Sequence, residues 1–382
     1  MELYIHIPFC RKKCRYCSFS SYVGQEAFFE EYINLILIEA EARKNEIQEP
    51  LQTAYIGGGT PSLLPPHLLC RLISGLQNIF EFGHVEEFTS EANPGTVTQE
   101  WLDAAVGLGI NRLSFGMQTY QDHLLRILGR IHHFDEVDRS FRLARISGIE
   151  NLSLDLMFGI PQQSCNDWIE TLNEAVALHP HHISAYGLIP EEGTPLFRDL
   201  ATGTLQLPDP EEERRMYDDA ITFLSRHGFR QYEISNFALK GHECRHNIGY
   251  WSQIPYVGLG VSAASMTDVS SDQYGMTYTR RTNPETLSDY STMVRENRSV
   301  HVHETISPQE ARFETMMLGL RMNRGISETQ FYKMHGRTLL SCYGKKLCEL
   351  EKQGLLIHAE GCWKLSRRGF DIQNSILVEF MD

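Results

Sequence analysis

The chain has 382 residues, of which 42% are hydrophobic and 22% charged, so it can bury a large core and is long enough for two domains. Its 35 Lys and Arg residues against 49 Asp and Glu residues give a net charge of −14, which argues against broad nucleic-acid binding as the main activity. No apolar run approaches the roughly 20 residues that span a bilayer, so we expect at most peripheral membrane contact.

The first half of the chain alternates short apolar, β-branched runs with longer helical patterns. This alternation is typical of parallel strands joined by crossover helices. We therefore expect an α/β fold with six βα units, a partial barrel. The predicted strands are Leu3–Phe9, Thr53–Ile56, Glu87–Ser90, Arg112–Phe115, Asn151–Met157 and His182–Leu188.

Three cysteines follow the first predicted strand within eight residues: Cys10, Cys14 and Cys17. Three thiolates on one loop can bind three irons of a 4Fe-4S cluster and leave the fourth iron open. Cluster potentials reach roughly −700 mV, low enough to reduce a bound sulfonium when an electron donor supplies the electron. Structural zinc with His6 as a fourth ligand is the alternative, although zinc ligand pairs usually lie further apart.

A disulfide framework is the other alternative, and it fits poorly because nine cysteines is an odd number. The cysteine loop lies so close to Met1 that we expect no targeting peptide. A reducing cytoplasm suits exposed thiolates, and we expect a cytoplasmic protein.

Polar residues gather where the next predicted strands end. The second strand leads into Gly57–Ser62, the sequence GGGTPS, whose backbone amides and hydroxyls can hold a ligand's ammonium or carboxylate, although such a segment is more often a tight turn. Glu91, Gln118 and Asp155 follow later strands. Because strand ends share one rim of a parallel barrel, we expect these groups to lie together.

A charged side chain within an apolar strand is costly to bury without a partner. Glu91 and Asp155 are therefore expected either to bind a ligand or to pair with Arg112 or Arg130. Arg130 is itself a candidate for binding a ligand carboxylate through its planar guanidinium.

Together, these segments resemble the coproporphyrinogen-oxidase-like branch of the radical-SAM proteins. The matching motifs are YIHIPFC, CxxxCxYC, GGGTPS, EANP, SFGMQ, LGRIH and DLMFGIP, in the family's order over most of residues 1–190. The resemblance implies a 4Fe-4S cluster on the three cysteines and a bound S-adenosyl-L-methionine. The residues that it implies for the S-adenosylmethionine site are Tyr4, Tyr16, Gly58, Gly59, Thr60, Glu91, Gln118, Arg130 and Asp155.

Within this branch, the chain resembles the HemW haem chaperone family more than the oxidases. The oxidases carry a fourth cysteine where this chain has Phe19, and an N-terminal extension that we expect to be absent. The resemblance implies a protein that binds haem and transfers it to apo-haem proteins. The alternatives are an oxygen-independent coproporphyrinogen III oxidase, another radical-SAM enzyme that modifies a tetrapyrrole, and a zinc-binding module.

A further motif, HNxxYW, begins at His246 in a connecting region that we assign to residues 241–303, after a barrel domain at 1–240. The family resemblance implies that His246 binds haem, flanked by Tyr250 and Trp251. The alternative is that His246 makes hydrogen bonds while the aromatic side chains fill the core. Ala264 stands where relatives often have histidine.

Residues 304–382 are predicted to form a separate C-terminal domain. Ser307-Pro-Gln-Glu and Ser327-Glu-Thr-Gln begin two helices, a third runs over Leu339–Gln353, and Leu355–His358 with Cys362–Leu365 predicts a hairpin. Three helices and a hairpin indicate a winged-helix-like α+β domain. Its charges are nearly balanced, so we expect a cover or docking surface rather than a DNA-binding domain. Residues 266–303 are polar and predicted to be irregular, with an exposed loop at 270–272.

Overall fold

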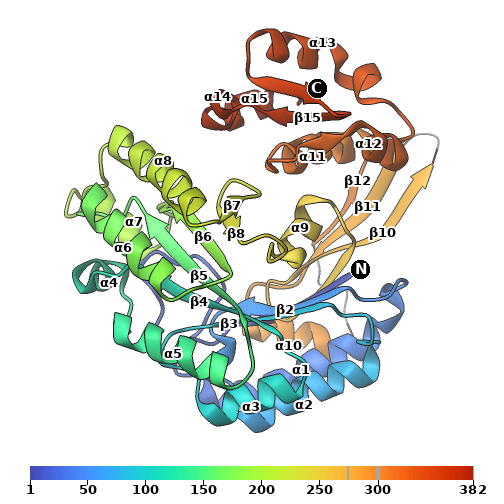
Figure 1. The fold of residues 1–382 in the computed structure, drawn as a ribbon. Coiled ribbons are helices and arrows are strands. Elements are labelled where there is room, and N and C mark those ends of the chain that lie inside the picture. The colour runs from blue at the N-terminus through green and yellow to red at the C-terminus, as the bar shows by residue number, and fades with distance from the viewer. Residues whose placement is uncertain (273–274, 298–301, 382) are drawn as a thin grey trace.

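The computed structural model describes residues 1–272, 275–297 and 302–381. Figure 1 shows a curved sheet with helices along its outer face and a smaller C-terminal unit at one end. Twelve strands form the sheet in the order β12-β11-β10-β9-β1-β2-β3-β4-β5-β6-β8-β7, so the barrel is open.

The six predicted parallel strands are all present, and the predicted α/β class is confirmed. They are β1 (Glu2–Ile7), β2 (Thr53–Gly58), β3 (Glu87–Ala92), β4 (Arg112–Gln118), β5 (Asn151–Phe158) and β6 (His182–Gly187). The crossover helices are α1 (Phe29–Ala42), α2 (Pro66–Ile79), α3 (Gln99–Gly107), α4 (Asp122–Leu128), α5 (Phe134–Ile146) and α6 (Cys165–Ala177). The strands are in parallel register, for example Leu3 with Ala54 and Ile5 with Ile56. Their carboxyl ends consequently meet at one rim.

The core lies between this sheet and its helices. Leu3, Ile5 and Ile7 of β1 are completely buried, as are Ile33 and Ile36 of α1. Strands buried on both faces read as near-continuous apolar runs, which is why the sequence predicted them well.

The prediction of irregular structure over 266–303 is wrong for the described residues. β9 (Tyr256–Leu259) pairs in parallel with β1, and β10 (Ala264–Asp272), β11 (Gly275–Thr282) and β12 (Val302–Ile306) continue the sheet antiparallel. α10 (Leu287–Arg295) packs beside α1. Ser270 and Ser271 are exposed, but they belong to β10 rather than to a loop. The proposed domain limits at 240 and 303 stay a prediction.

On the other side of the barrel, the chain forms α7 (Pro195–Ala201), α8 (Pro210–Arg226) and two short strands, β7 (Arg230–Gln231) and β8 (Asn236–Ala238). α9 (Arg245–Trp251) then lies at the amino ends of the parallel strands, where the amide of His246 donates to Glu87 at the start of β3. The HNxxYW motif therefore lies on this helix, at the end of the barrel opposite the cysteine loop.

The C-terminal unit has the predicted helices and hairpin. It comprises α11 (Pro308–Gly319), β13 (Ile326–Ser327), α12 (Glu328–His335), α13 (Leu339–Lys352), β14 (Leu356–Ala359), β15 (Cys362–Leu365), α14 (Arg367–Asp371) and α15 (Gln373–Val378). The strands form a separate antiparallel sheet, β13-β15-β14. Phe331, Leu347 and Trp363 are buried in its own hydrophobic core.

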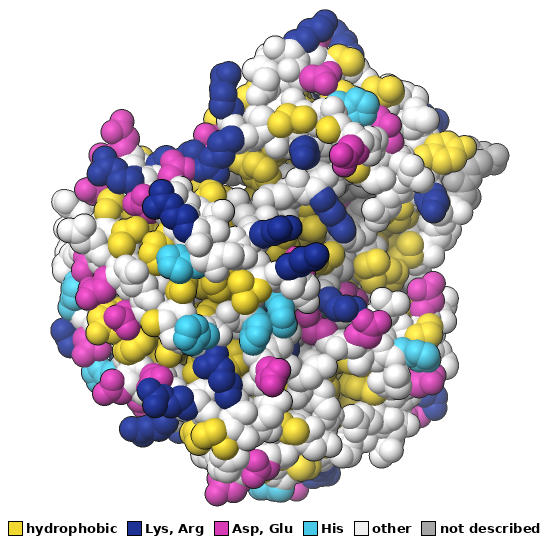
Figure 2. Space-filling model, in the orientation of Figure 1, with side chains coloured by type: hydrophobic (Ala, Val, Ile, Leu, Met, Phe, Trp, Pro, Cys, Tyr) yellow, Lys and Arg dark blue, Asp and Glu magenta, His cyan; other side chains and the backbone are white. Residues whose placement is uncertain are grey.

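Figure 2 shows the surface hollowed between this unit and the barrel, with several Lys and Arg side chains on the same face. Over the described ranges, no helix combines the length and apolar character needed to cross a bilayer.

Candidate functional site

The cysteine loop is held at the carboxyl end of β1 by backbone hydrogen bonds. The amide of Cys10 donates to the carbonyl of Tyr22 over 3.0 Å, and the amide of Tyr22 donates to Pro8 over 2.7 Å. The loop thus folds back on the strand end, and Cys14 and Cys17 lie between these anchors.

Two side chains from neighbouring strand ends donate to the cysteine sulfurs. Nη1 of Arg130 lies 3.4 Å from Sγ of Cys14, and Oγ1 of Thr60 lies 3.6 Å from Sγ of Cys10. Such donors stabilise a thiolate, the form in which cysteine binds iron. Burial raises the pKa of the Cys10 and Cys17 thiols. A site that buries thiols while offering donors to their sulfurs fits a metal cluster.

Within the described residues, no group of three or more His, Cys, Asp or Glu side chains surrounds a point where a single metal ion could sit. His6, the predicted fourth zinc ligand, is buried with both ring nitrogens in hydrogen bonds, to the hydroxyl of Tyr4 at 3.1 Å and the carbonyl of Ser20 at 3.0 Å. The zinc alternative therefore lacks its fourth ligand. A 4Fe-4S cluster does not need this arrangement, because each thiolate binds a different iron.

The glycines of GGGTPS let β2 approach the cysteine loop closely. The amides of Gly59 and Thr60 each donate over 2.8 Å, to Ile7 and Phe9 respectively, and the amide of Gly58 donates to Oε2 of Glu91 over 3.0 Å. The prediction that these amides are available to a ligand is therefore wrong. Gly58 has φ +103°, and a Cβ there would overlap the His6 ring.

Glu91 is held by hydrogen bonds and not by an ion pair. Its carboxylate accepts from the hydroxyl of Tyr55 over 2.9 Å and from the amide of Gly58, and among the described residues Arg112 acts on it only through its charge, not as an ion pair. The alternative that Arg112 or Arg130 neutralises it is therefore wrong. Burial, with a smaller contribution from Asp155, raises the pKa of Glu91 to about 7.

Asp155 faces the same rim from β5. Its Oδ1 accepts from the hydroxyl of Ser114 over 3.1 Å, and burial raises its pKa. Two partly buried carboxyl groups with raised pKa values on one rim are typical of a binding site rather than of a structural core.

A cavity of about 160 Å³ lies over the three cysteines, and we call it the cysteine cavity. Seven of the nine predicted S-adenosylmethionine residues line it: Tyr16, Gly58, Gly59, Glu91, Gln118, Arg130 and Asp155. Thr60 lies in an adjoining cavity with Cys14 and Arg130, and Tyr4 lies in a different one.

Sequence reasoning did not assign several residues of the cysteine cavity, among them Asn93 and Tyr186. Oδ1 of Asn93 accepts from Nη2 of Arg130 over 2.6 Å, and the hydroxyl of Tyr186 donates to Oε1 of Gln118 over 3.2 Å. Asn93 directly follows the end of β3, so its place after a parallel strand was the available signal.

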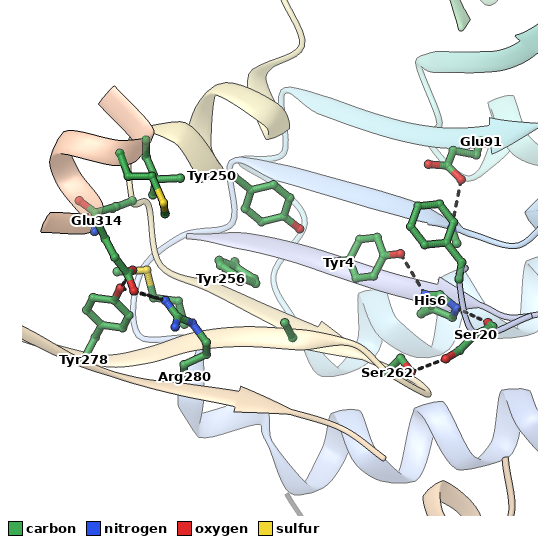
Figure 3. A pocket seen from close by; sticks show the side chains of 17 residues that line it. Tyr4, His6, Ser20, Glu91, Tyr250, Tyr256, Ser262, Tyr278, Arg280 and Glu314 are labelled. Carbon is green, nitrogen blue, oxygen red and sulfur yellow. Dashed lines mark hydrogen bonds and ion pairs between the residues drawn. The ribbon is translucent and has the colours of Figure 1, made fainter. Parts of the chain in front are cut away.

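A larger cavity of about 550 Å³ adjoins the cysteine cavity, and we call it the aromatic cavity (Figure 3). Its walls come from β1, α9, β9, β10, β11 and α11. Apolar side chains dominate the lining, with four tyrosines: Tyr4, Tyr250, Tyr256 and Tyr278. Phe19, Gly58 and Glu91 line both cavities, so the two cavities adjoin at these residues.

His246 lies beneath the aromatic cavity, buried and fully hydrogen-bonded. Its Nδ1 lies 2.7 Å from Oγ1 of Thr53 and its Nε2 2.9 Å from the hydroxyl of Tyr250, and its ring stacks on Tyr55. Burial, with a smaller effect of Arg112, lowers its pKa to about 3. Both ring nitrogens are engaged in this structure, as in the alternative of a hydrogen-bonded core histidine, and the assignment of His246 as the haem ligand stays a prediction.

Tyr250 and Trp251, which were predicted to flank the haem together, line different cavities. Tyr250 lines the aromatic cavity, whereas Trp251 lines a smaller cavity beside the C-terminal unit, with the guanidinium of Arg321 at 4.4 Å from its ring. Ala264, where relatives often have histidine, also lines the aromatic cavity.

Known protein families match both the barrel and the C-terminal unit. The family model of the radical SAM superfamily matches residues 4–175, and that of the HemN C-terminal domain matches residues 306–372. The chain is 36% identical to the haem chaperone HemW of Bacillus subtilis (strain 168) over 99% of this chain and 98% of that protein. It is 30% identical to HemW of Escherichia coli (strain K12) over 100% of this chain and 98% of that protein.

Among solved structures, coproporphyrinogen III oxidase (HemN) from Escherichia coli, a radical SAM enzyme, superposes with a TM-score of 0.83. The match covers 99% of this chain and 89% of that one at 22% identity, and it establishes the fold.

Proposed function

We propose that this chain, which belongs to the haem chaperone HemW family of radical SAM proteins, binds haem and transfers it to apo-haem proteins. The observation that carries the proposal is the aromatic cavity, which opens beside the cysteine cavity. Its volume lies within the range of roughly 300–1,000 Å³ that is usual for cofactor sites.

The cofactors that accompany this family are a 4Fe-4S cluster and S-adenosyl-L-methionine. We assign the cluster to Cys10, Cys14 and Cys17, and S-adenosylmethionine to the residues of the cysteine cavity, with Arg130 touching both sites. When bound, the two groups supply one-electron chemistry at the strand rim. The electron comes from a separate donor, which we include among the partners.

The walls of the aromatic cavity suit a flat, largely apolar macrocycle with acidic side groups. Tyr250 and Tyr256 present an edge-to-face pair with ring centroids 4.7 Å apart, and Met266 and Leu318 add apolar surface. Nε2 of Gln253 is buried and lies beside the hydroxyl of Tyr278, which also lines the cavity. It can donate to a propionate carboxylate of haem.

The C-terminal unit contributes one wall of this cavity through Glu314, Met317 and Leu318 of α11. We propose that it covers the bound haem and offers a docking surface for an apo-haem protein. We further propose a cytoplasmic location, where thiolates stay reduced, with at most peripheral membrane contact.

The decisive experiment is anaerobic reconstitution of the full chain with iron and sulfide, followed by haem titration. The same preparation, with S-adenosylmethionine and a reductant, is assayed for conversion of coproporphyrinogen III. We expect stoichiometric haem uptake without decarboxylation. Conversion without stable haem binding would overturn the proposal in favour of an oxidase, and another modified tetrapyrrole would indicate a different radical-SAM enzyme.

The cavity assignment has its own test. Ala264→Phe places a large side chain in the aromatic cavity and is expected to weaken haem binding. Ser270→Phe on the same strand is the matched control, because Ser270 is exposed and does not line the cavity. Equal haem affinity for both variants would place haem elsewhere.

A further inference from the structure

We propose that Phe19 is a binding residue shared by the two cavities, and that its ring forms the wall between bound haem and bound S-adenosylmethionine. Through this wall, each ligand strengthens the binding of the other. This role of Phe19 rests on the haem binding proposed above and on the assignment of S-adenosylmethionine to the cysteine cavity. It couples the two ligands through a single side chain.

Phe19 stands out among the three residues that line both cavities. The other two are Gly58, which has no side chain, and Glu91, whose carboxylate already accepts from Tyr55 and from the amide of Gly58. Phe19 is large and apolar, and yet it is 64% exposed. A ligand in either cavity would cover part of its ring, and this burial of apolar surface favours binding.

The backbone of Phe19 is fixed to the cysteine loop. Its carbonyl accepts from Nζ of Lys13 over 3.0 Å. Burial raises the pKa of the Cys17 thiol, and the amide of Phe19 opposes this rise by donating to the sulfur. The ring therefore projects from a segment that is bonded to one of the three cysteines assigned to the cluster.

The next residue fixes the same segment to the aromatic cavity. The carbonyl of Ser20 accepts from Nε2 of His6 over 3.0 Å, and its hydroxyl oxygen lies 2.6 Å from that of Ser262 (Figure 3). His6 and Ser262 both line the aromatic cavity. Because the backbone is held on both sides, the ring of Phe19 adjusts to a ligand mainly by rotation of its own side chain.

These constraints determine the sign of the coupling. An exposed ring loses rotational freedom when the first ligand packs against it, and this loss opposes binding. The second ligand then meets a wall that is already in place, so it binds more tightly. The two ligands lie in different cavities and contact different sides of the ring, so they do not compete for it. By thermodynamic linkage, haem and S-adenosylmethionine change each other's affinity by the same factor.

The test measures this factor by isothermal titration calorimetry under anaerobic conditions, with the full chain and its cluster reconstituted. S-adenosylmethionine is titrated with and without saturating ferric haem, and ferric haem is titrated with and without saturating S-adenosylmethionine. No reductant is added, so the readout is binding alone. We expect each ligand to lower the Kd of the other by at least about fivefold.

The variants remove the wall or leave it in place. In Phe19→Ala, we expect the factor to fall to about one, and in Phe19→Leu, which keeps a smaller apolar side chain, to an intermediate value. Val23→Ala is the matched control, because Val23 is 49% exposed nearby in the chain and lines neither cavity. It should keep the wild-type factor.

Three results would overturn the role of Phe19: a wild-type protein that binds both ligands without any mutual gain in affinity, a factor that Phe19→Ala leaves unchanged, or an equal loss of the factor in Val23→Ala. A wild-type protein that takes up no haem would instead overturn the proposed function. One that takes up haem but no S-adenosylmethionine would overturn the assignment of the cysteine cavity. The titrations with one ligand reveal both of these failures, which separates them from an error in the coupling.

Discussion

Arg130 joins the cysteine loop to the rim of the barrel through Cys14. Nη1 of Arg130 lies 3.4 Å from Sγ of Cys14, while Nη2 donates over 2.6 Å to both Asn93 and the carbonyl of Gly116. One guanidinium thus contacts a cluster ligand and the ends of two parallel strands. Its position couples the geometry of the loop to that of the S-adenosylmethionine site proposed here.

We predict that Arg130→Met lowers both the iron content and the reduction potential of the reconstituted cluster. A hydrogen bond to a charged group contributes about 1.5–3 kcal/mol, and hydrogen bonds and charge near cluster sulfurs raise the potential. Iron and sulfide analysis with a redox titration measures both effects. Arg126→Met, on the exposed face of α4, is the control. A wild-type potential in Arg130→Met would show that the contact does not act on the cluster.

Gly58→Ala is expected to destabilise the protein more than a matched glycine change. Gly58 has φ +103° and its Cβ would overlap the His6 ring, whereas Gly148 has φ +95° with nothing within 4 Å of its Cβ position. Gly148→Ala therefore measures backbone strain alone, about 1–2 kcal/mol. Gly58→Ala should lose about 1–3 kcal/mol more through overpacking. Urea unfolding gives both values, and equal losses would mean that His6 moves aside without cost.

The parallel strands could be predicted because their apolar runs are local in sequence. β1 was predicted at Leu3–Phe9 and lies at Glu2–Ile7, and the cysteine loop follows as expected. The aromatic cavity could not be predicted, because it depends on β9 pairing with β1 and on α11 packing nearby, contacts between distant segments. The threonines of β11 favour a strand, and they were the sequence signal for this element. The other residues of β11 are largely polar, so the segment was predicted to be irregular.

The site residues divide in the same way. Residues at strand ends, such as Glu91 and Asp155, follow from the topology of a parallel sheet. The burial of His246 could not be predicted from the topology of the sheet. Its hydrogen bonds to Thr53 and Tyr250 form only when α9 closes the amino end of the barrel. A motif shows which residues recur together and does not show which of them faces a cavity.

Glu91→Gln is expected to become more stable relative to the wild type as the pH rises. The pKa of Glu91 is raised from its ordinary value of 4.5 to about 7, so the unfolded chain releases this proton before the folded chain does. The contribution of Glu91 to stability is therefore fully present below pH 4.5 and is lost as the pH rises through about 7. The full difference should be of the order of 3 kcal/mol, since the pKa rises from 4.5 to about 7 and each pKa unit corresponds to about 1.4 kcal/mol.

To measure this effect, the free energy of unfolding of both proteins is determined between pH 5.5 and pH 8. This range covers roughly the upper part of the Glu91 titration. Burial also raises the pKa of Glu2, to about 8. Because Glu2 is present in both proteins, its contribution cancels in the comparison. A difference that stays constant with pH would show that Glu91 keeps an ordinary pKa.

Arg321→Met is expected to loosen the C-terminal unit from the barrel. Nε of Arg321 donates over 2.8 Å to Oε2 of Glu233, whose side chain is completely buried, and its guanidinium lies over Trp251. The other oxygen of Glu233 accepts from Ser235 and Asn236, so the carboxylate cannot turn toward water. Removing one partner of a buried pair costs about 3–5 kcal/mol, and partial exposure of Arg321 reduces the expected loss to about 2–3 kcal/mol.

The matched control is Arg367→Met, which removes the ion pair between α14 and Asp218 of α8. Both of these side chains are nearly half exposed, so this pair should contribute at most about 1 kcal/mol. Urea unfolding compares the two variants, and proteolysis detects release of the C-terminal unit. Equal losses would mean that the burial of Glu233 does not depend on Arg321. A larger loss in Arg321→Met would show that this buried contact is the stronger of the two links between the C-terminal unit and the barrel.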